Sequence, residues 1–111
     1  MRIVAGEYGS RKIKTLKGKH TRPTSSKVRA AIFDHYGSYF EGGYFLDLFA
    51  GSGAMGLEAL SRGFEHASFI EKDSKALRVV QENIELLQVS DKASLYRGDA
   101  LSKMAKLAHR Y

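Results

Sequence analysis

A glycine-rich segment flanked by carboxylates is the part of this sequence best suited to bind a small molecule. Residues 47–56 read Asp-Leu-Phe-Ala-Gly-Ser-Gly-Ala-Met-Gly. Gly51 and Gly53 permit a tight turn whose backbone approaches a ligand, and Gly56 permits close contact between a helix and a strand. Glu71 follows Gly51 by 20 residues, the spacing typical of an acid that accepts hydrogen bonds from ribose hydroxyls. The pattern predicts an adenosyl or dinucleotide ligand at a strand–turn–helix junction.

Asp47 bears on which of these two ligands the segment binds. A dinucleotide places its pyrophosphate on the glycine turn, where a neighbouring carboxylate is unfavourable. S-adenosylmethionine (SAM) brings an ammonium and a sulfonium group, so Asp47 favours SAM over NAD. In the alternative interpretation, Asp47 is a strand-end carboxylate satisfied by amides of the turn, and it still shapes the glycine segment. Asp99 follows a predicted strand, from where its carboxylate can reach or flank an adenine amine.

The segments around these residues alternate between strand and helix patterns. Residues 44–49 form a short, mostly apolar run typical of a buried parallel strand, and further strands are predicted at 66–71 and 93–97. A first helix is predicted at 54–62, with Gly63 as its C-terminal cap. A second, long helix is predicted to begin at a cap formed by Asp73 or Ser74, and it carries one apolar stripe of Leu77, Val80, Ile84 and Leu87. A third helix is predicted from Leu101 to about Leu107. This alternation predicts right-handed crossovers and a parallel α/β sheet.

The N-terminal segment has a different pattern. Residues 2–16 alternate weakly, which predicts a short hairpin with a basic second strand at 11–16. Residues 17–23 form a predicted loop that ends at Pro23. Thr24 or Ser25 can cap a helix that runs to about Tyr36. The apolar positions of that helix have helical spacing and are Val28, Ala31, Ile32 and Tyr36.

Positive charge is concentrated at the start of the chain. The formal net charge is +6, and residues 1–30 hold nine Lys and Arg against the single acid Glu7, a local charge of +8. The remaining residues carry nine basic and eleven acidic side chains, a charge of −2. A basic block beside a nearly neutral domain predicts an arm that binds a polyanion. The alternative is a solvated basic tail.

Composition narrows the class of protein. The chain has 111 residues with 43% hydrophobic and 27% charged, which fits one small globular domain. No apolar run approaches the roughly 18 residues of a membrane span, and the N-terminus has no apolar core typical of a signal peptide. Cysteine is absent, and no histidines are paired at metal-ligand spacing. We therefore expect a cytoplasmic protein without a metal.

Together these motifs resemble the RsmD-type family of bacterial methyltransferases, which modify the exocyclic N2 amine of a guanine in 16S ribosomal RNA (rRNA). The resemblance covers essentially the whole chain, and the combination of the glycine motif with Arg22-Pro23-Thr24 is its most specific part. The segments that carry it are 6–13, 21–24, 28–33, 47–53, 56–63, 69–73 and 98–100. It implies a Rossmann-like class I SAM-dependent methyltransferase fold, with a basic arm at 1–23 and a SAM-binding half-domain at 24–111.

The resemblance also implies roles for individual residues. Gly51, Ser52 and Gly53 would face the methionine part of SAM, Glu71 would hold the ribose, and the 22–24 turn would close over the methionine end. Asp99 and Ala100 would border the adenine. The implied cofactor-binding residues are Arg22, Thr24, Asp47, Ala50, Gly51, Ser52, Gly53, Gly56, Glu71, Lys72, Asp99 and Ala100. The implied contacts to rRNA phosphates are Arg11, Lys12, Lys14, Lys17, Lys19 and Arg22.

The sequence departs from the family at the catalytic motif. Methyltransferases of this family carry an Asn/Asp-Pro-Pro-Tyr/Phe motif after the fourth strand, whereas the only proline here is Pro23. We therefore assign no catalytic residue, expect the C-terminal half of the fold to be absent, and expect this chain alone to be inactive. With no fourth strand, one side of 44–49 would be a bare apolar edge, which predicts self-association.

Three other functions remain open on the sequence. A methyltransferase could act on DNA or protein, and the basic arm favours nucleic acid over protein without separating RNA from DNA. The lack of the proline motif favours a non-catalytic module that binds SAM or RNA. An NAD-dependent oxidoreductase is disfavoured by Asp47 and by the basic arm.

Overall fold

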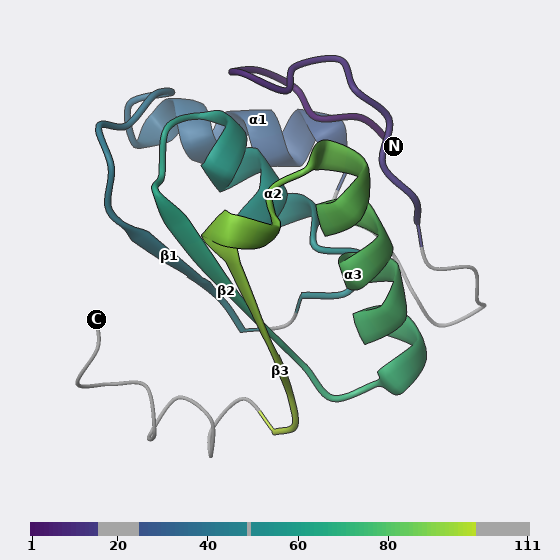
Figure 1. Ribbon diagram of the computed structural model, residues 1–111. Coiled ribbons are helices and arrows are strands. Elements are labelled where there is room, and N and C mark those ends of the chain that lie inside the picture. Colours follow the sequence, from purple (N-terminus) through teal and green to yellow (C-terminus); the bar gives the residue numbers. More distant parts are fainter. Residues whose placement is uncertain (16–24, 49, 100–111) are drawn as a thin grey trace.

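The computed structural model describes residues 1–15, 25–48 and 50–99. The elements in these ranges are α1 (Ser26–His35), β1 (Tyr44–Asp47), α2 (Ala54–Ser61), β2 (His66–Glu71), α3 (Ser74–Leu87), the short 3-10 helix η1 (Ser90–Lys92) and β3 (Ala93–Arg97). They alternate between helix and strand as the sequence predicts, and Figure 1 shows their arrangement. The helix predicted from Leu101 lies outside the described residues.

The strands form a parallel sheet in the order β1-β2-β3. Tyr44 of β1 pairs with His66 of β2, and Ala67 of β2 pairs with Ala93 of β3. The central strand β2 is buried along Ala67–Ile70, as expected for a parallel strand with neighbours on both sides. Because the carboxyl ends of parallel strands meet at one edge, the segments that follow β1, β2 and β3 lie close together.

Helices α2 and α3 pack on the same face of the sheet, around the ring of Phe69. The ring lies against Gly56 of α2, and Gly53 at the start of α2 lies beside both Phe69 and Val80 of α3. The buried core on this face continues through Leu57, Leu60, Ile84 and Leu87. The right-handed crossovers β1-α2-β2 and β2-α3-β3 place both helices on one side, in agreement with the predicted topology.

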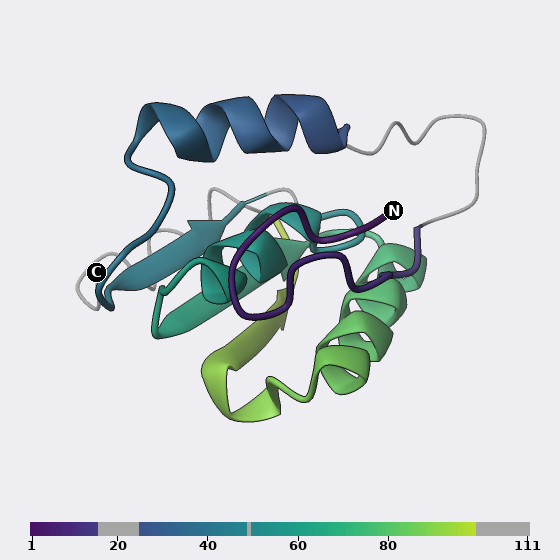
Figure 2. The same cartoon turned by 90° about the horizontal axis from the view of Figure 1, so that it is seen from above.

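The N-terminal segment is packed on the outside of α2 and α3 (Figure 2). Its two arms form an antiparallel loop in which Ile3 N–H donates to Arg11 O at 3.0 Å and Ser10 N–H donates to Ile3 O at 2.8 Å. The side chains of Ile3 and Ile13 are buried in the main core. The predicted hairpin is therefore present as a tight loop. Over 11–15, the described part of the predicted basic strand at 11–16, the regular strand is reduced to one bridge between Arg2 and Lys12. The reason is that part of the backbone of this segment forms hydrogen bonds with α3 instead of with the opposite arm of the loop, as Lys14 does with Asn83.

Helix α1 begins at the predicted cap but buries an unexpected face. Ser25 is the N-cap, and its hydroxyl accepts a hydrogen bond from Val28 N–H at 3.2 Å. The apolar side chains of Val28, Ile32 and Tyr36 are 51%, 39% and 72% exposed. Arg29 and Phe33, one turn apart, are buried instead. The buried face of α1 is thus set by an ion pair and one ring rather than by its apolar stripe.

Candidate functional site

The glycine segment forms a tight bend between β1 and α2. Gly53 N–H donates to Ala50 O at 2.7 Å, and Ala50 N–H donates to Ile70 O of the neighbouring strand at 3.2 Å. Gly51 and Gly53 have φ angles of +55° and +85°, in the left-handed region that favours glycine. Apart from its chain neighbours, no atom of the described residues lies within 4 Å of a Cβ added at Gly51. The bend therefore presents bare backbone to open space, as a site for close approach of a ligand requires.

Gly56 lies in close contact with the sheet, while its place among the predicted cofactor residues stays a prediction. A Cβ at this position would lie 2.3 Å from Cε1 of Phe69 and 2.7 Å from its Cζ. Real Cβ atoms do not approach a ring so closely, so any other residue would push α2 away from the sheet. This contact confirms the predicted role of Gly56 in close helix–strand contact.

Asp47, at the end of β1, holds the first turn of α2. Its Oδ2 accepts a hydrogen bond from Gly56 N–H at 3.1 Å, and the residue is only 8% exposed. The N-cap of α2 is Gly53, which has no side chain to cap the helix. A carboxylate near a helix N-terminus satisfies free N–H groups and interacts favourably with the helix dipole. The alternative interpretation gave Asp47 amides of the turn as its partners, whereas Gly56 belongs to the first turn of α2.

Glu71, at the end of β2, joins the glycine bend to the start of α3. Its Oε1 accepts a hydrogen bond from Gly51 N–H and its Oε2 accepts one from Asp73 N–H, each at 2.9 Å. The backbone oxygen of Glu71 accepts a hydrogen bond from Gly98 N–H at 3.1 Å, which places the start of the Gly98–Asp99 segment against the same strand end. The structure thus brings together the predicted residues that follow β1, β2 and β3.

The other predicted cofactor residues are distributed around this edge or lie outside the description. Ala50 and Ser52 are buried in the bend, and Lys72 and Asp99 are exposed beside it. Arg22, Thr24 and Ala100 lie outside the described residues. The predicted RNA contacts Lys17 and Lys19 lie outside them as well.

Asn83 is a buried polar residue of this region that the sequence analysis missed. It lies on α3, is fully buried, and donates from Nδ2 to Ser52 O of the bend at 2.9 Å. The signal in the sequence was a polar residue beside the apolar stripe that contains Val80, Ile84 and Leu87. In the structure that stripe includes Ala76 and Asn83, while Leu77 is only half-buried.

A buried cluster of charges ties the N-terminal segment and α1 to α2. The Glu58 carboxylate accepts hydrogen bonds from Arg29 Nε at 3.0 Å and Arg62 Nε at 2.8 Å. It also accepts from the N–H groups of Val4 and Ala5 at 2.9 and 3.1 Å. Burial raises the pKa of Glu58, but these four donors outweigh it, so the pKa lies below its ordinary value. Sequence patterns did not reveal Glu58, because a charged residue in a helix ordinarily faces solvent.

The described basic residues of the N-terminal segment lie on its exposed side. Arg11, Lys12 and Lys14 are all exposed. Arg11 Nη2 donates to Leu86 O at 2.8 Å, and Lys14 Nζ pairs with Glu82 at 2.5 Å on the surface of α3. Surface pairs of this kind stabilise proteins little and are easily exchanged for another anion. The segment is thus a basic surface fixed to the domain rather than a free tail.

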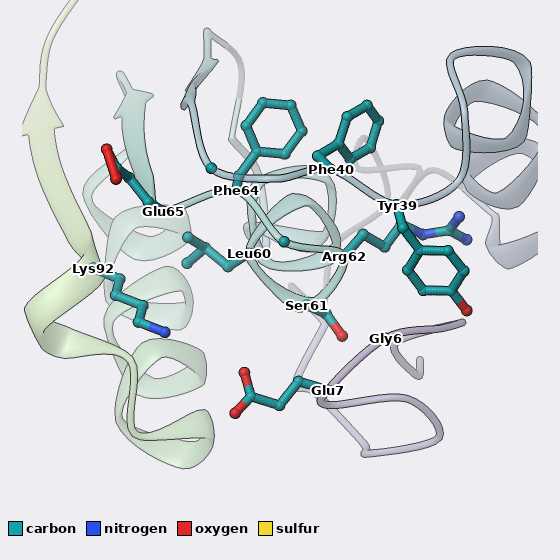
Figure 3. A pocket seen from close by; sticks show the side chains of 12 residues that line it. Gly6, Glu7, Tyr39, Phe40, Leu60, Ser61, Arg62, Phe64, Glu65 and Lys92 are labelled. Carbon is teal, nitrogen blue, oxygen red and sulfur yellow. The ribbon is translucent and has the colours of Figure 1, made fainter.

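Besides the glycine bend, the described residues line a larger and a smaller cavity. The larger, about 800 Å³ and open to solvent, is lined by residues that include Glu7, Tyr39, Arg62, Phe64 and Lys92 (Figure 3). It lies at the amino ends of the strands, the end of the sheet opposite to the bend. The smaller, about 320 Å³, is apolar and lies between α1 and β1. In Rossmann-like sheets ligands bind at the carboxyl ends of the strands, so the bend and not the larger cavity is the candidate site.

Within 1–15, 25–48 and 50–99, no group of three or more His, Asp or Glu side chains could hold a metal ion. Among the helices described, none has both the length and the apolar character needed to cross a membrane.

Comparisons with known proteins agree with the geometry. A protein of Bacillus subtilis (strain 168) named "Putative rRNA methyltransferase YlbH" is 46% identical over 110 residues, which make up 99% of this chain and 60% of that protein. "Ribosomal RNA small subunit methyltransferase D" of Escherichia coli (strain K12) is 34% identical over 106 residues, which make up 96% of this chain and 53% of that protein. The chain spans about half the length of the curated relatives it matches.

The solved structure named "Putative methyltransferase yhhF from Escherichia coli" superimposes with a TM-score of 0.81 and 32% identity. The superposition covers 95% of this chain and 56% of that one. The parallel sheet with its helices is accordingly the Rossmann-like arrangement of methyltransferases. The family model described as Conserved hypothetical protein 95 matches residues 1–111. The chain therefore belongs to the Conserved hypothetical protein 95 family, the RsmD family whose motifs its sequence resembles.

Proposed function

We propose that this chain binds SAM at the glycine bend and docks rRNA on its basic N-terminal segment. Both would serve methylation of the N2 amine of a guanine in 16S rRNA. The observation that carries the proposal is the meeting of the Gly51 bend with the Glu71 carboxylate at the carboxyl edge of the sheet. Membership of a family whose relatives are named rRNA methyltransferases supports the reaction class. A ribosomal RNA substrate would place the protein in the cytoplasm.

The residues at the edge fit SAM. The open space over Gly51 admits a ligand against bare backbone. Glu71 accepts one hydrogen bond on each oxygen, and a carboxylate with about four lone-pair sites can also accept from ribose hydroxyls. Asp47 lies beneath the bend and keeps negative charge close to it, which suits a cationic ligand and not a pyrophosphate. When bound, SAM supplies an electrophilic methyl group on its sulfonium.

The contribution of this chain to the reaction is orientation. The bend and Glu71 would fix the adenosyl and methionine parts, so that the methyl group points to an incoming guanine amine. In-line transfer between two groups held in place gains much of its rate from proximity and alignment. We assign no catalytic residue among the 111, and metal ions have no proposed role.

The basic segment supports a nucleic-acid partner. Lys12 is exposed beside Arg2, and Arg11 and Lys14 lie on the same segment over α3. Such side chains neutralise phosphates and position a nucleic acid without reading its sequence. The rRNA target itself is inferred from the family.

Calorimetry with SAM and with NADH tests the cofactor. We expect SAM to bind and NADH to give no heat of binding at the same concentrations, because a pyrophosphate on the glycine bend would meet the negative charge of Asp47. Binding of NADH in preference to SAM would overturn the proposal.

RNA binding at increasing salt tests the basic segment. Lys12→Ala should weaken binding of 16S rRNA and reduce the slope of log affinity against log salt by about one counterion. Lys92→Ala removes one positive charge that does not belong to the N-terminal segment, and it should leave the slope close to that of the wild type. Equal slopes in the wild type and Lys12→Ala would remove Lys12 from the RNA surface.

A non-catalytic binding module is the second candidate. The contacts that support it are those of binding alone, namely the Gly51 bend held by Glu71 and the exposed basic N-terminal segment. Transfer of labelled methyl groups from SAM to small ribosomal subunits separates the two. We expect no transfer by this chain alone despite SAM binding, and measurable transfer by it would show that its own residues suffice for catalysis.

A further inference from the structure

The buried carboxamide of Asn83 connects the basic segment with the glycine bend. Its Oδ1 accepts a hydrogen bond from Lys14 N–H at 2.6 Å, and its Nδ2 donates to Lys14 O at 2.9 Å. The same Nδ2 donates to Ser52 O at 2.9 Å. Both amide hydrogens of Asn83 are therefore used, one on each of two segments that are far apart in the sequence.

This contact differs from that of an ordinary core amide. Asn83 pairs with both backbone groups of Lys14, as the neighbouring strand of a ladder would. Lys14 belongs to the proposed RNA surface, and Ser52 belongs to the proposed SAM site. Residue 83 is fully buried, and the low dielectric around it strengthens its hydrogen bonds and penalises their loss. A displacement of Lys14 therefore acts on the group that also holds Ser52.

We propose that Asn83 is a positioning residue that couples RNA docking to the conformation of the glycine bend. The inference rests on the proposed function and adds a connection between its two sites. RNA phosphates that draw Lys14 away from Glu82 would pull on the backbone held by Asn83, and this changes the hydrogen bond to Ser52. Coupling of binding free energies is reciprocal, so SAM at the bend would raise RNA affinity by the same factor.

Hydrogen exchange at the bend tests the coupling without requiring SAM. The amides of Gly51 and Gly53 are hydrogen-bonded to Glu71 and Ala50, so their exchange reports the state of the bend. Addition of 16S rRNA should change their exchange in the wild type and in Gln81→Ala, an exposed amide on the same helix. It should leave their exchange unaltered in Asn83→Ala.

Affinities give the second measurement. In the wild type, saturating SAM should lower the Kd for RNA by roughly fivefold or more. In Asn83→Ala, the ratio of the Kd without SAM to the Kd with SAM should fall to about one. Asn83→Ala should also weaken SAM itself by about tenfold, because Ser52 O loses a buried donor. A purely structural amide would lower the unfolding temperature without changing the ratio.

A second pair of variants serves if Asn83→Ala fails to fold. Lys14→Pro removes the N–H that donates to Asn83, and Lys14→Ala removes the ammonium group that RNA would draw away from Glu82. Loss of coupling in both variants, with coupling kept in Lys12→Ala, would support the inference, and coupling kept in either Lys14 variant would overturn it. RNA that binds the wild type without altering the bend amides would overturn it and leave the proposed function standing. Failure of the wild type to bind RNA at all would overturn both.

Discussion

The carboxylates at the candidate site accept hydrogen bonds from N–H groups of the protein's own backbone. Glu71 holds Gly51 N–H and Asp73 N–H, and Asp47 holds Gly56 N–H. Each acid therefore fixes the position of a segment that contacts or flanks the bend. A ligand would meet a bend already shaped by these bonds, which lowers the entropic cost of ordering it on binding.

Removal of the Glu71 side chain should weaken SAM binding. Glu71→Ala loses the proposed ribose acceptor and releases Gly51 N–H, which together should reduce binding free energy by about 1–3 kcal/mol. Calorimetry measures the change, with Glu85→Ala as a control for an exposed acid on α3. Affinity equal to that of the wild type would place Glu71 outside the site.

Substitution of Gly56 should destabilise the protein, although glycine to alanine in a helix ordinarily stabilises. The ordinary gain is up to about 1 kcal/mol, but the new Cβ would meet the Phe69 ring at 2.3 Å. Overpacking of this kind costs about 1–3 kcal/mol, so Gly56→Ala should unfold at lower denaturant concentration. In a Phe69→Leu background the loss should shrink or reverse. A Gly56→Ala variant as stable as the wild type would show that the ring moves aside freely.

At the scale of elements, one carboxylate organises the packing of three segments. Glu58 binds Arg29 of α1, Arg62 after α2, and the backbone of Val4 and Ala5. Arg62 continues the chain of contacts to Asp34 and Ser38, and its guanidinium lies over the Phe33 ring, 5.2 Å from the centroid. Breaking one member of a buried ion cluster leaves the others unpaired, which is strongly destabilising.

Glu58→Gln should lower the unfolding free energy by about 3–5 kcal/mol at neutral pH. The variant should also lose part of the acid sensitivity of the wild type. The folded pKa of Glu58 lies below its ordinary value of 4.5, so its contribution is complete above pH 4.5 and is lost as the pH falls through the folded pKa. The difference between wild type and variant should therefore shrink below pH 4.5. Denaturant unfolding from pH 3 to 7 measures it, with the exposed Glu41→Gln as control.

A difference that stays constant over that pH range would show that Glu58 has the same pKa in the folded and unfolded states. The ion cluster would then contribute packing alone.

The elements of the sheet were predictable because their signals are local. The strand at His66–Glu71 and the Asp73 cap were found at the observed positions, since an apolar run and an Asx residue act within a few residues. The meeting of Gly51 and Glu71 followed from spacing and strand order. By contrast, Arg29 and Asn83 are buried by partners distant in sequence, so no local pattern marks them. The same holds for the packing of the N-terminal segment, which depends on Glu58.

At the scale of the whole molecule, one edge of the sheet is uncovered in the part of the chain that the structure describes. There β1 pairs with β2 on one side and has no strand on the other. Exposed apolar side chains lie nearby, with Ile32 39% and Tyr44 56% exposed. An open edge beside apolar surface favours pairing with another strand.

We predict that the chain self-associates through this edge. Light scattering should show a mean mass that rises with protein concentration, and Tyr44→Lys should suppress the rise because a charged edge residue disfavours pairing. Tyr39→Lys places the same charge away from β1 and should behave as the wild type. A single monomeric species at all concentrations would refute the prediction.

The site belongs to the molecule as a whole, because the ends of three strands build it and both helices of one face support it. Asp47 of β1, Glu71 of β2 and Gly98 after β3 meet at one edge. The larger cavity lies at the amino ends of the strands and is lined by Glu7, Tyr39 and Lys92 among others. It is a second possible location for a ligand.

An NMR titration of the labelled protein with SAM separates these two locations most directly. We predict that the amides of Gly51, Ser52, Gly53 and Glu71 shift in a saturable manner, while those of Tyr39 and Lys92 do not. Saturable shifts confined to the larger cavity, or none at the bend, would contradict the account.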